Sequence, residues 1–118
     1  MVKTAIVTGA ANGIGKAISR RLKDDGCYIF AVDIDDGNGK SLINELGENF
    51  AEYVHCNVTS ENEVEFLFKS AVSKKGKVDI LVNNAGILRD NMIHKMPIED
   101  FDAVIGTNLK GTWLMCRA

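Results

Sequence analysis

The chain has 118 residues, 46% of them hydrophobic and 25% charged, and fourteen lysines and arginines against sixteen acidic residues give a net charge of −2. These values are typical of a globular chain that forms at most one domain. There is no basic stripe of the kind that binds nucleic acid, and no apolar run approaches the roughly 20 residues that cross a bilayer, so neither a nucleic acid nor a membrane is expected as a partner.

Four apolar runs along the chain predict β-strands. They cover residues 4–8 (TAIVT), 27–33 (CYIFAVD), 51–56 (AEYVHC) and 78–83 (VDILVN). The runs are nearly continuous and are separated by helical segments, which indicates parallel strands buried on both faces and joined by right-handed crossovers. The sequence therefore predicts a βαβ architecture of the α/β class.

Helical periods separate these runs. The first helix extends to Gly26, a short helix around residues 41–46 ends at Gly47, and a third helix opens at a capping box of Ser60 and Glu63 and closes at Gly76. The apolar positions at helical spacing are Ile14, Ala17, Ile18 and Leu22 in the first helix and Val64, Leu67, Phe68, Ala71 and Val72 in the third.

A last helix begins through Pro97, which suits a first-turn position. Its apolar stripe starts at Phe101 and continues through Val104, Ile105, Leu109 and Thr112, and it is still under way in the final segment, residues 106–118. We therefore predict a single domain, residues 1–118, that ends within the helix carrying Asn108.

The segment TGAANGIG, residues 8–15, joins the first predicted strand to the first predicted helix. Glycines at positions 9, 13 and 15 allow a tight turn, close approach of a phosphate, and packing of the helix start against the sheet. The N–H groups and the dipole of that helix terminus favour an anion. The spacing differs from G-x-G-x-x-G, so the dinucleotide interpretation depends on the strand before it and the helix after it. The alternative is a glycine-rich turn without a ligand.

Asp33 ends the second predicted strand, eighteen residues after Gly15. An acidic residue at that point can accept hydrogen bonds from the adenosine ribose of a dinucleotide. The alternative is a solvated turn aspartate beside Asp35 and Asp36.

Three segments together resemble the short-chain dehydrogenase/reductase family, and the resemblance covers the whole chain. TGAANGIG is similar to its T-G-x-x-x-G-x-G motif, NNAG at residues 83–86 to its signature after the fourth strand, and TNLKG at residues 107–111 to its asparagine-bearing helix motif. Within the family, CNVT (56–59) and GILRDNMIHKM (86–96) look most like the β-ketoacyl-acyl-carrier-protein reductases. The resemblance implies a Rossmann-type doubly wound parallel sheet, here incomplete with about four strands in the order 3-2-1-4 and helices on both faces.

The resemblance also implies a role for each matching position. The pyrophosphate would be surrounded by Gly9, Asn12, Gly13, Ile14 and Gly15. The adenine would meet Asn57 and Val58, and the nicotinamide-side ribose would meet Asn84, Ala85 and Gly86. Asn108 would bend its helix and hold a water in the proton relay, as a catalytic residue. For Asn83 and Asn84 the alternative is a polar turn, and for Asn108 it is a buried side chain satisfied by local backbone.

The catalytic serine and the Y-x-x-x-K pair of that family follow the asparagine helix. This chain has only Tyr28 and Tyr53, and the residues four positions beyond them are Val32 and Asn57. We therefore expect the cofactor-binding half of an NAD(P)-dependent oxidoreductase that transfers hydride between nicotinamide and a carbonyl or alcohol, with a 3-oxoacyl thioester as one candidate substrate. The isolated chain is expected to be inactive. The alternative is a stand-alone nucleotide-binding or interaction module without catalysis.

The cofactor half also predicts a preference for NAD(H) over NADP(H) by at least about tenfold, or roughly 1.4 kcal/mol. Asp33 can accept from a ribose hydroxyl but would repel a 2′-phosphate, Ile34 is neutral, and Asn12 stands where an arginine could have balanced the phosphate. The expected partners are the dinucleotide, a small carbonyl or alcohol substrate, and further copies of the chain. An apolar sheet edge at residues 79–83 and the apolar face of the last helix suggest self-association of the isolated chain.

The remaining reactive side chains predict no further site. His55 and His94 stand alone in the sequence, so no metal is expected. The three cysteines at positions 27, 56 and 116 are odd in number and far apart, which favours packed, reduced thiols. Met1 leads straight into a strand-like segment without a signal-peptide pattern, so we expect a cytoplasmic protein.

Overall fold

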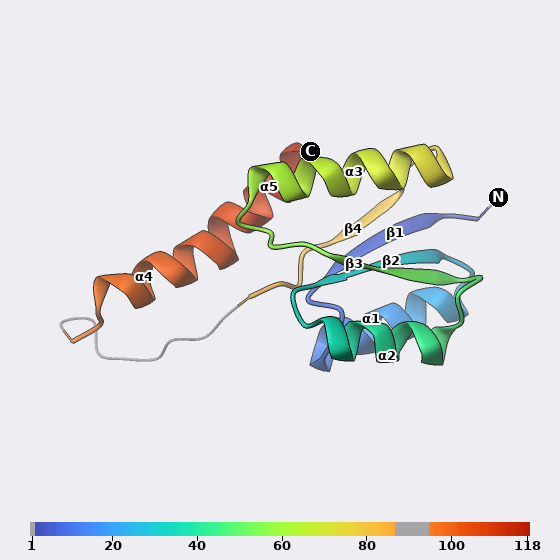
Figure 1. Ribbon diagram of the computed structural model, residues 1–118, viewed down its shortest axis with the longest axis horizontal. Helices are drawn as coiled ribbons and strands as arrows, with labels where there is room; N and C mark the ends of the chain where they lie inside the picture. Colours follow the sequence, from blue (N-terminus) through green and yellow to red (C-terminus); the bar gives the residue numbers. More distant parts are fainter. Residues whose placement is uncertain (1, 87–94) are drawn as a thin grey trace.

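A computed structural model describes residues 2–86 and 95–118 and shows an α/β fold (Figure 1). The strands are β1 (Thr4–Thr8), β2 (Tyr28–Asp33), β3 (Ala51–His55) and β4 (Ile80–Val82). The helices are α1 (Gly13–Asp24), α2 (Asp36–Leu46), α3 (Glu61–Lys75), α4 (Ile98–Val104), the π-helical segment η1 (Ile105–Gly111) and α5 (Thr112–Arg117). Among the described residues, no helix combines the length and apolar composition needed to span a membrane.

Within the described residues, four parallel strands form one sheet in the order β3-β2-β1-β4, which confirms the predicted topology and the Rossmann-type fold class. β1 occupies the interior of the sheet, with Val7 opposite Ala31 of β2 on one side and Val82 of β4 on the other. β4 is shorter than the predicted 78–83. The Asp79 N–H still donates to the Thr4 carbonyl of β1 at 2.9 Å, but the chain beyond Val82 leaves the ladder.

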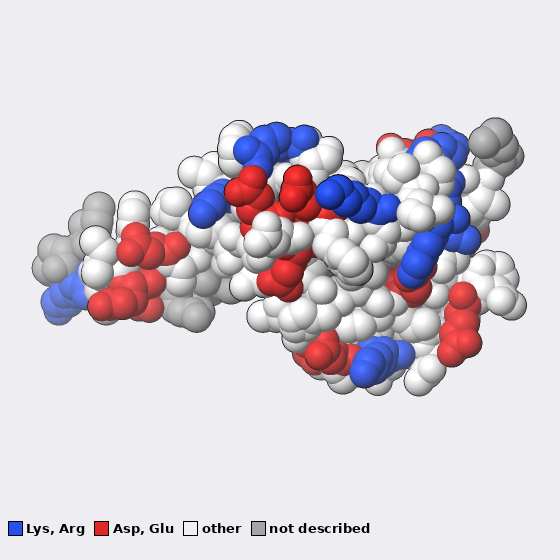
Figure 2. All heavy atoms as spheres, turned by 45° about the horizontal axis from the view of Figure 1, so that its top comes forward, with Lys and Arg blue, Asp and Glu red and all other residues white. Residues whose placement is uncertain are grey.

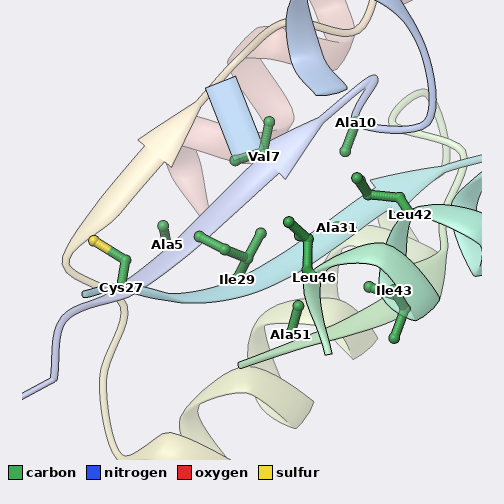
Figure 3. Close-up of a cluster of buried hydrophobic side chains, with 10 residues drawn as sticks. All are labelled: Ala5, Val7, Ala10, Cys27, Ile29, Ala31, Leu42, Ile43, Leu46 and Ala51. Carbon is green, nitrogen blue, oxygen red and sulfur yellow. The ribbon is translucent and has the colours of Figure 1, made fainter. Parts of the chain in front are cut away.

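Helices cover both faces of the sheet, as predicted: α1 and α2 lie on one face, and α3 and α5 on the other (Figure 1). Successive side chains of β1 point to opposite faces, so Ala5 and Val7 enter one core and Ile6 enters the other. Figure 3 shows the core beneath α2, where Leu42 and Leu46 reach toward Ile29 and its neighbours on the strands. β1 and β2 are apolar in nearly every position because each is buried on both faces of the sheet.

Helix α2 begins earlier than the predicted 41–46. Asp35 caps it by accepting a hydrogen bond from the Asn38 backbone N–H at 3.2 Å. Glycine is a poor helix former, so Gly37 and Gly39 in the first turns concealed this start in the sequence. Gly39 is required there because a Cβ at its position would collide with the Tyr53 ring on β3.

Helix α3 begins and ends as predicted. The Ser60 hydroxyl accepts from the Glu63 N–H at 3.3 Å, and Gly76 closes the helix in the left-handed conformation with φ +81°. The predicted apolar stripe is wrong at its last position, because Val72 is exposed. The other correction is in the capping box: the Glu63 carboxylate accepts from the backbone N–H of Asn57.

The last helical run differs from the prediction in two ways. Pro97 is the N-cap residue of α4 and lies one position before the helix. The run is not one regular α-helix, because η1 makes wider π-helical turns between α4 and α5. The predicted stripe is largely uncovered, since Phe101, Ile105 and Leu109 are all exposed, whereas the run is anchored further on by buried Leu114 and Met115.

Part of the apolar stripe of α1 is also uncovered. Of the four apolar positions at helical spacing in α1, Ile14 and Ala17 are exposed, and Ile18 and Leu22 are partly buried against the core. On the surface, basic and acidic side chains lie interspersed across the face that Figure 2 shows.

Cys27 and Cys56 are buried free thiols as expected, but Cys116 is an exposed one.

Candidate functional site

A cleft of about 380 Å³ opens where the carboxyl ends of all four described strands meet. This is the edge at which open parallel sheets bind ligands. Loops that follow β1, β2, β3 and β4 supply its walls. The lining residues are Gly9, Asn12, Gly13, Val32, Asp33, Ile34, Cys56, Asn57, Val58, Asn84, Ala85, Gly86 and Thr107.

The glycine loop between β1 and α1 has the geometry that its sequence suggests. Gly9 and Gly13 adopt φ values of +63° and +54°, a region that residues with a Cβ rarely enter. Gly15 lies behind the cleft: a Cβ there would collide with the Gly9 carbonyl oxygen and lie 2.6 Å from Nδ2 of Asn84. Gly15 therefore lets the first turn of α1 close onto the loop. Ile14 is exposed and lies outside the cleft lining.

The N-terminus of α1 is prepared for an anion. Its N-cap residue, Asn12, makes no side-chain capping bond, and the first turn of α1 contains no acidic residue. Helices α2, α3 and α4 all carry acidic side chains in their first turns. The positive dipole end of α1 is thus neither capped by a side chain nor neutralised by an acidic residue of its own first turn.

The Asn12 side chain is engaged elsewhere. Its Nδ2 donates to Asp35 Oδ2 at 3.1 Å, and its Oδ1 accepts from Asn38 Nδ2 at 3.2 Å. The bond from Asn12 and those from Asn38 hold the pKa of the Asp35 carboxyl below its usual range. A second carboxylate therefore stays ionised beside the glycine loop, which the sequence did not indicate.

The Asp33 carboxylate links β2 to the glycine loop. Its Oδ2 accepts from the Ala11 N–H at 3.0 Å, and its Oδ1 accepts from the N–H groups of Ile34 and Asp35 at 2.7 and 3.1 Å. Asp33 is therefore more than the solvated turn aspartate considered as the alternative. The carboxylate lines the cleft in an orientation fixed by backbone donors.

Thr8 connects the two central loops of the site. Its hydroxyl donates to the Val82 carbonyl at 3.3 Å and accepts from the N–H groups of Asn84 and Ala85, both at 2.9 Å. Asn84 Nδ2 adds a bond to the Gly9 carbonyl at 3.2 Å. The motifs TGAANGIG and NNAG are thus one hydrogen-bonded unit. A threonine as the last residue of an interior strand, before a glycine, was the available signal for this role.

The far wall of the cleft follows β3. Asn57 shapes the turn there, because its Oδ1 accepts from the N–H and the hydroxyl of Thr59 at 2.9 and 2.7 Å. Val58 is buried, and a Cβ on Gly111 of η1 would lie 2.6 Å from its Cγ2. Burial raises the pKa of the neighbouring Cys56 thiol to about 11, so this thiol is protonated at neutral pH and is no nucleophile.

Asn108 lies in the π-helical segment η1, next to the NNAG loop. A Cβ on Gly86 would lie 3.2 Å from Asn108 Oδ1, and the Asn108 carbonyl accepts from the Thr112 hydroxyl at 3.1 Å. Asn108 is exposed, so the alternative of a buried asparagine is wrong. π-Helical turns occur often at functional positions because they reorient side chains within a helix. Thr107, quoted only as part of its motif, lines the cleft.

The two histidines have different outcomes. His55 Nδ1 lies 2.7 Å from Asp36 Oδ1, a contact that the sequence did not indicate. His94 lies outside the described residues, as do most positions of the segment 86–96. In the part of the chain that the structure describes, no three His, Cys, Asp or Glu residues gather as a metal site would require.

Comparison with known proteins places this geometry in context. The sequence model of the short-chain dehydrogenase family matches residues 3–118. Over 114 residues the chain is 42% identical to the 3-oxoacyl-[acyl-carrier-protein] reductase FabG of Thermotoga maritima, covering 94% of this chain and 46% of that protein. Over 114 residues it is 39% identical to momilactone A synthase of Oryza sativa subsp. japonica, covering 95% of this chain and 42% of that protein.

A solved structure agrees with the fold. The 3-ketoacyl-(acyl-carrier-protein) reductase of Brucella melitensis, complexed with NADH, superposes with a TM-score of 0.92 at 36% identity, covering 98% of this chain and 47% of that one. The chain thus spans about half the length of the relatives it matches.

Proposed function

This chain belongs to the short-chain dehydrogenase family, and we propose that it supplies the dinucleotide-binding half of an NAD(P)-dependent oxidoreductase. The observation that carries the proposal is the cleft itself. It joins an uncapped helix N-terminus, left-handed glycines and a fixed carboxylate at the carboxyl edge of a parallel sheet. The NADH named in the structure of the Brucella melitensis relative supports the same class of ligand.

Each wall of the cleft suits one part of a dinucleotide. The first turn of α1 and the loop from Gly9 to Gly13 would hold the pyrophosphate, with Gly15 behind them bringing the helix close. Asp33 would accept from the adenosine ribose, and Asn57 and Val58 would border the adenine. Asn84, Ala85 and Gly86 would line the nicotinamide-side ribose.

When bound, the cofactor would give a hydride to a carbonyl or take one from an alcohol, and the chain would contribute position and one proton-relay group. In this proposal Asn108 holds a water beside the Gly86 loop. Because the 118 residues contain no Y-x-x-x-K, the chain has no tyrosine–lysine pair to exchange a proton with a carbonyl oxygen. We therefore expect the isolated chain to give no turnover, with the acid/base and substrate pocket supplied by other residues.

The substrate proposed is a carbonyl or alcohol, with 3-oxoacyl thioesters as the first class to test. The Thermotoga maritima relative is a 3-oxoacyl-[acyl-carrier-protein] reductase, whereas the rice relative carries a different name at similar identity. A stand-alone nucleotide-binding module is the second candidate, favoured by the absence of Y-x-x-x-K. NADH oxidation by the complete protein with acetoacetyl thioesters or simple ketones separates the two.

Binding is tested directly by calorimetric titration of NADH into the complete protein that contains this chain. Gly15→Ala is expected to weaken NADH binding more than tenfold, because the new Cβ would collide with the Gly9 carbonyl. The matched control is Gly37→Ala, whose Cβ would meet only Asp35 Oδ1, at an ordinary 4.0 Å. Failure of the parent to bind NADH or NADPH at millimolar concentration would refute the proposal. Unchanged binding by folded Gly15→Ala would refute the role of the loop.

A further inference from the structure

Tyr53 lies in β3, outside the cleft lining. Its hydroxyl nevertheless contacts Asp33, the residue proposed to bind the adenosine ribose. It lies 2.8 Å from the Asp33 carbonyl oxygen and 2.6 Å from Asp36 Oδ1. The same carbonyl also accepts from the Cys56 N–H at 3.1 Å. Asp33 is therefore held at both ends, its carboxylate by three backbone donors and its carbonyl by two donors from the β3 segment.

The tyrosine ring is fixed as firmly as its hydroxyl. Gly39 of α2 leaves the space that the ring occupies, since a Cβ there would overlap three of the ring carbons. The ring therefore lies directly against the α2 backbone and spans from β3 to the first turns of that helix. A tyrosine fits this position because its length brings the hydroxyl to the turn between β2 and α2.

Asp36 completes the contact. Its carboxylate receives the Tyr53 hydroxyl and lies 2.7 Å from His55 Nδ1. The hydrogen bond from Tyr53, followed by that from His55, holds the pKa of Asp36 below its usual range. Burial, followed by the bond to Asp36, raises the pKa of Tyr53, so its hydroxyl keeps its proton at neutral pH. The hydroxyl then has one proton and two acceptors, the Asp33 carbonyl and the Asp36 carboxylate.

We propose that Tyr53 is a positioning residue for the adenosine ribose, acting through Asp33. The hydroxyl fixes the backbone of Asp33 against Asp36, so the turn from β2 into α2 keeps the Asp33 carboxylate facing the cleft. This proposal rests on the dinucleotide function proposed above and extends it to a residue that touches no part of the ligand.

A purely structural role is the competing explanation, because the ring also closes α2 onto β3. The two explanations differ in what they predict for the ligand. A structural tyrosine stabilises the fold alike for every ligand. A positioning tyrosine matters only when the ribose hydroxyls are present to meet Asp33.

The test combines Tyr53→Phe in the complete protein with two ligands, NADH and an NADH analogue that lacks both hydroxyls of the adenosine ribose. Phenylalanine keeps the ring against Gly39 and removes only the hydroxyl. We expect NADH binding to weaken about fivefold, or about 1 kcal/mol, and binding of the analogue to change less than twofold. The matched control is Tyr28→Phe, which removes a strand tyrosine hydroxyl that bonds to Glu52 at 3.2 Å, and should leave both affinities unchanged.

Three outcomes decide the inference. If the parent does not bind NADH, the proposed function fails and this inference falls with it. If the parent binds and Tyr53→Phe loses nothing, or loses equally for both ligands, the positioning role is overturned while the proposed function stands. Should Tyr53→Phe not fold, Asp36→Asn is the second variant: it keeps the ring and removes the charge beside the hydroxyl. A loss of about twofold for NADH alone supports the role, and equal losses overturn it.

Discussion

Replacing Asp33 by asparagine should move cofactor preference from NAD(H) toward NADP(H). The substitution keeps the size of the side chain but removes its charge and one of its acceptor oxygens. In the structure those oxygens accept from Ala11 on one side and from Ile34 and Asp35 on the other. An asparagine amide can serve only one of these sides, so the variant should also unfold more easily, by roughly 1–3 kcal/mol.

The size of the shift follows from two terms. A hydrogen bond to a charged acceptor contributes roughly 1.5–3 kcal/mol and a neutral one roughly 0.5–1.5 kcal/mol, so NADH should bind about five- to tenfold more weakly. Two unit charges about 5 Å apart repel by roughly 0.8–3.3 kcal/mol at effective dielectric constants of about 80 to 20. Removing one of them should strengthen NADPH binding, although Asp35 stays nearby. The parent should prefer NAD(H) at least about tenfold, and the variant should lose most of that ratio.

The assay is calorimetric titration of NADH and NADPH into the complete protein and into Asp33→Asn, after a thermal scan shows that the variant is folded. Asp24→Asn is the matched control, because that aspartate is exposed at the end of α1, outside the cleft lining. Equal affinities of the parent for both cofactors, or a variant ratio within twofold of the parent ratio, would show that Asp33 does not set the preference.

Three further predictions concern stability and association. Thr8→Val would leave the N–H groups of Asn84 and Ala85 without an acceptor, so the free energy of unfolding should fall by roughly 1–3 kcal/mol for each. Thr8→Ser keeps the hydroxyl and should lose much less. Urea titration that shows no loss in Thr8→Val would contradict the bridging role. Hydrogen bonds from the Thr4 backbone N–H and then from Lys77 lower the pKa of Asp79. The ionised Asp79 therefore stabilises the fold above the ordinary carboxyl pKa, and this stabilisation is lost as the pH falls through the lower pKa of the folded state. Asp79→Asn should flatten the fall in unfolding temperature below about pH 4, and identical pH profiles for parent and variant would contradict this. The isolated 118-residue chain should self-associate at micromolar concentration, because β4 forms an apolar sheet edge and the C-terminal helices expose large apolar side chains; light scattering from a stable monomer would exclude it.

Most of the fold could be predicted because burial on two faces leaves a plain record in the sequence. The runs at β1 and β2 are apolar in nearly every position, and the caps at Ser60 and Gly76 are local features with known geometry. The start of α2 could not be predicted in the same way. Gly39 lowers helix propensity locally. A glycine is needed there because of the Tyr53 ring, which belongs to another element of the chain.

The candidate site divides along the same line. The glycines of the loop and the acid at the end of β2 follow from local rules on turns and strand ends, so their places around one cleft were predictable. Thr8 and Asp35 were missed as parts of the site because their importance lies in partners that only the folded chain brings near. The stripe on the last helix misled for a related reason, since periodicity shows which side chains share a face but not whether anything covers that face.

The strand order also relates the site to the sequence in which a ribosome makes it. β1, β2 and β3 emerge first and are neighbours in the sheet, joined by crossovers through α1 and α2. The ribosome has already made the residues proposed for the pyrophosphate and adenosine, Gly9, Asp33 and Asn57, when it adds Asn84 after β4. The Thr8 hydroxyl can accept its two backbone hydrogen bonds only after that later segment, which contains the N–H groups of Asn84 and Ala85, has been made. The residues proposed for the pyrophosphate and the adenosine are thus made before those proposed for the nicotinamide side.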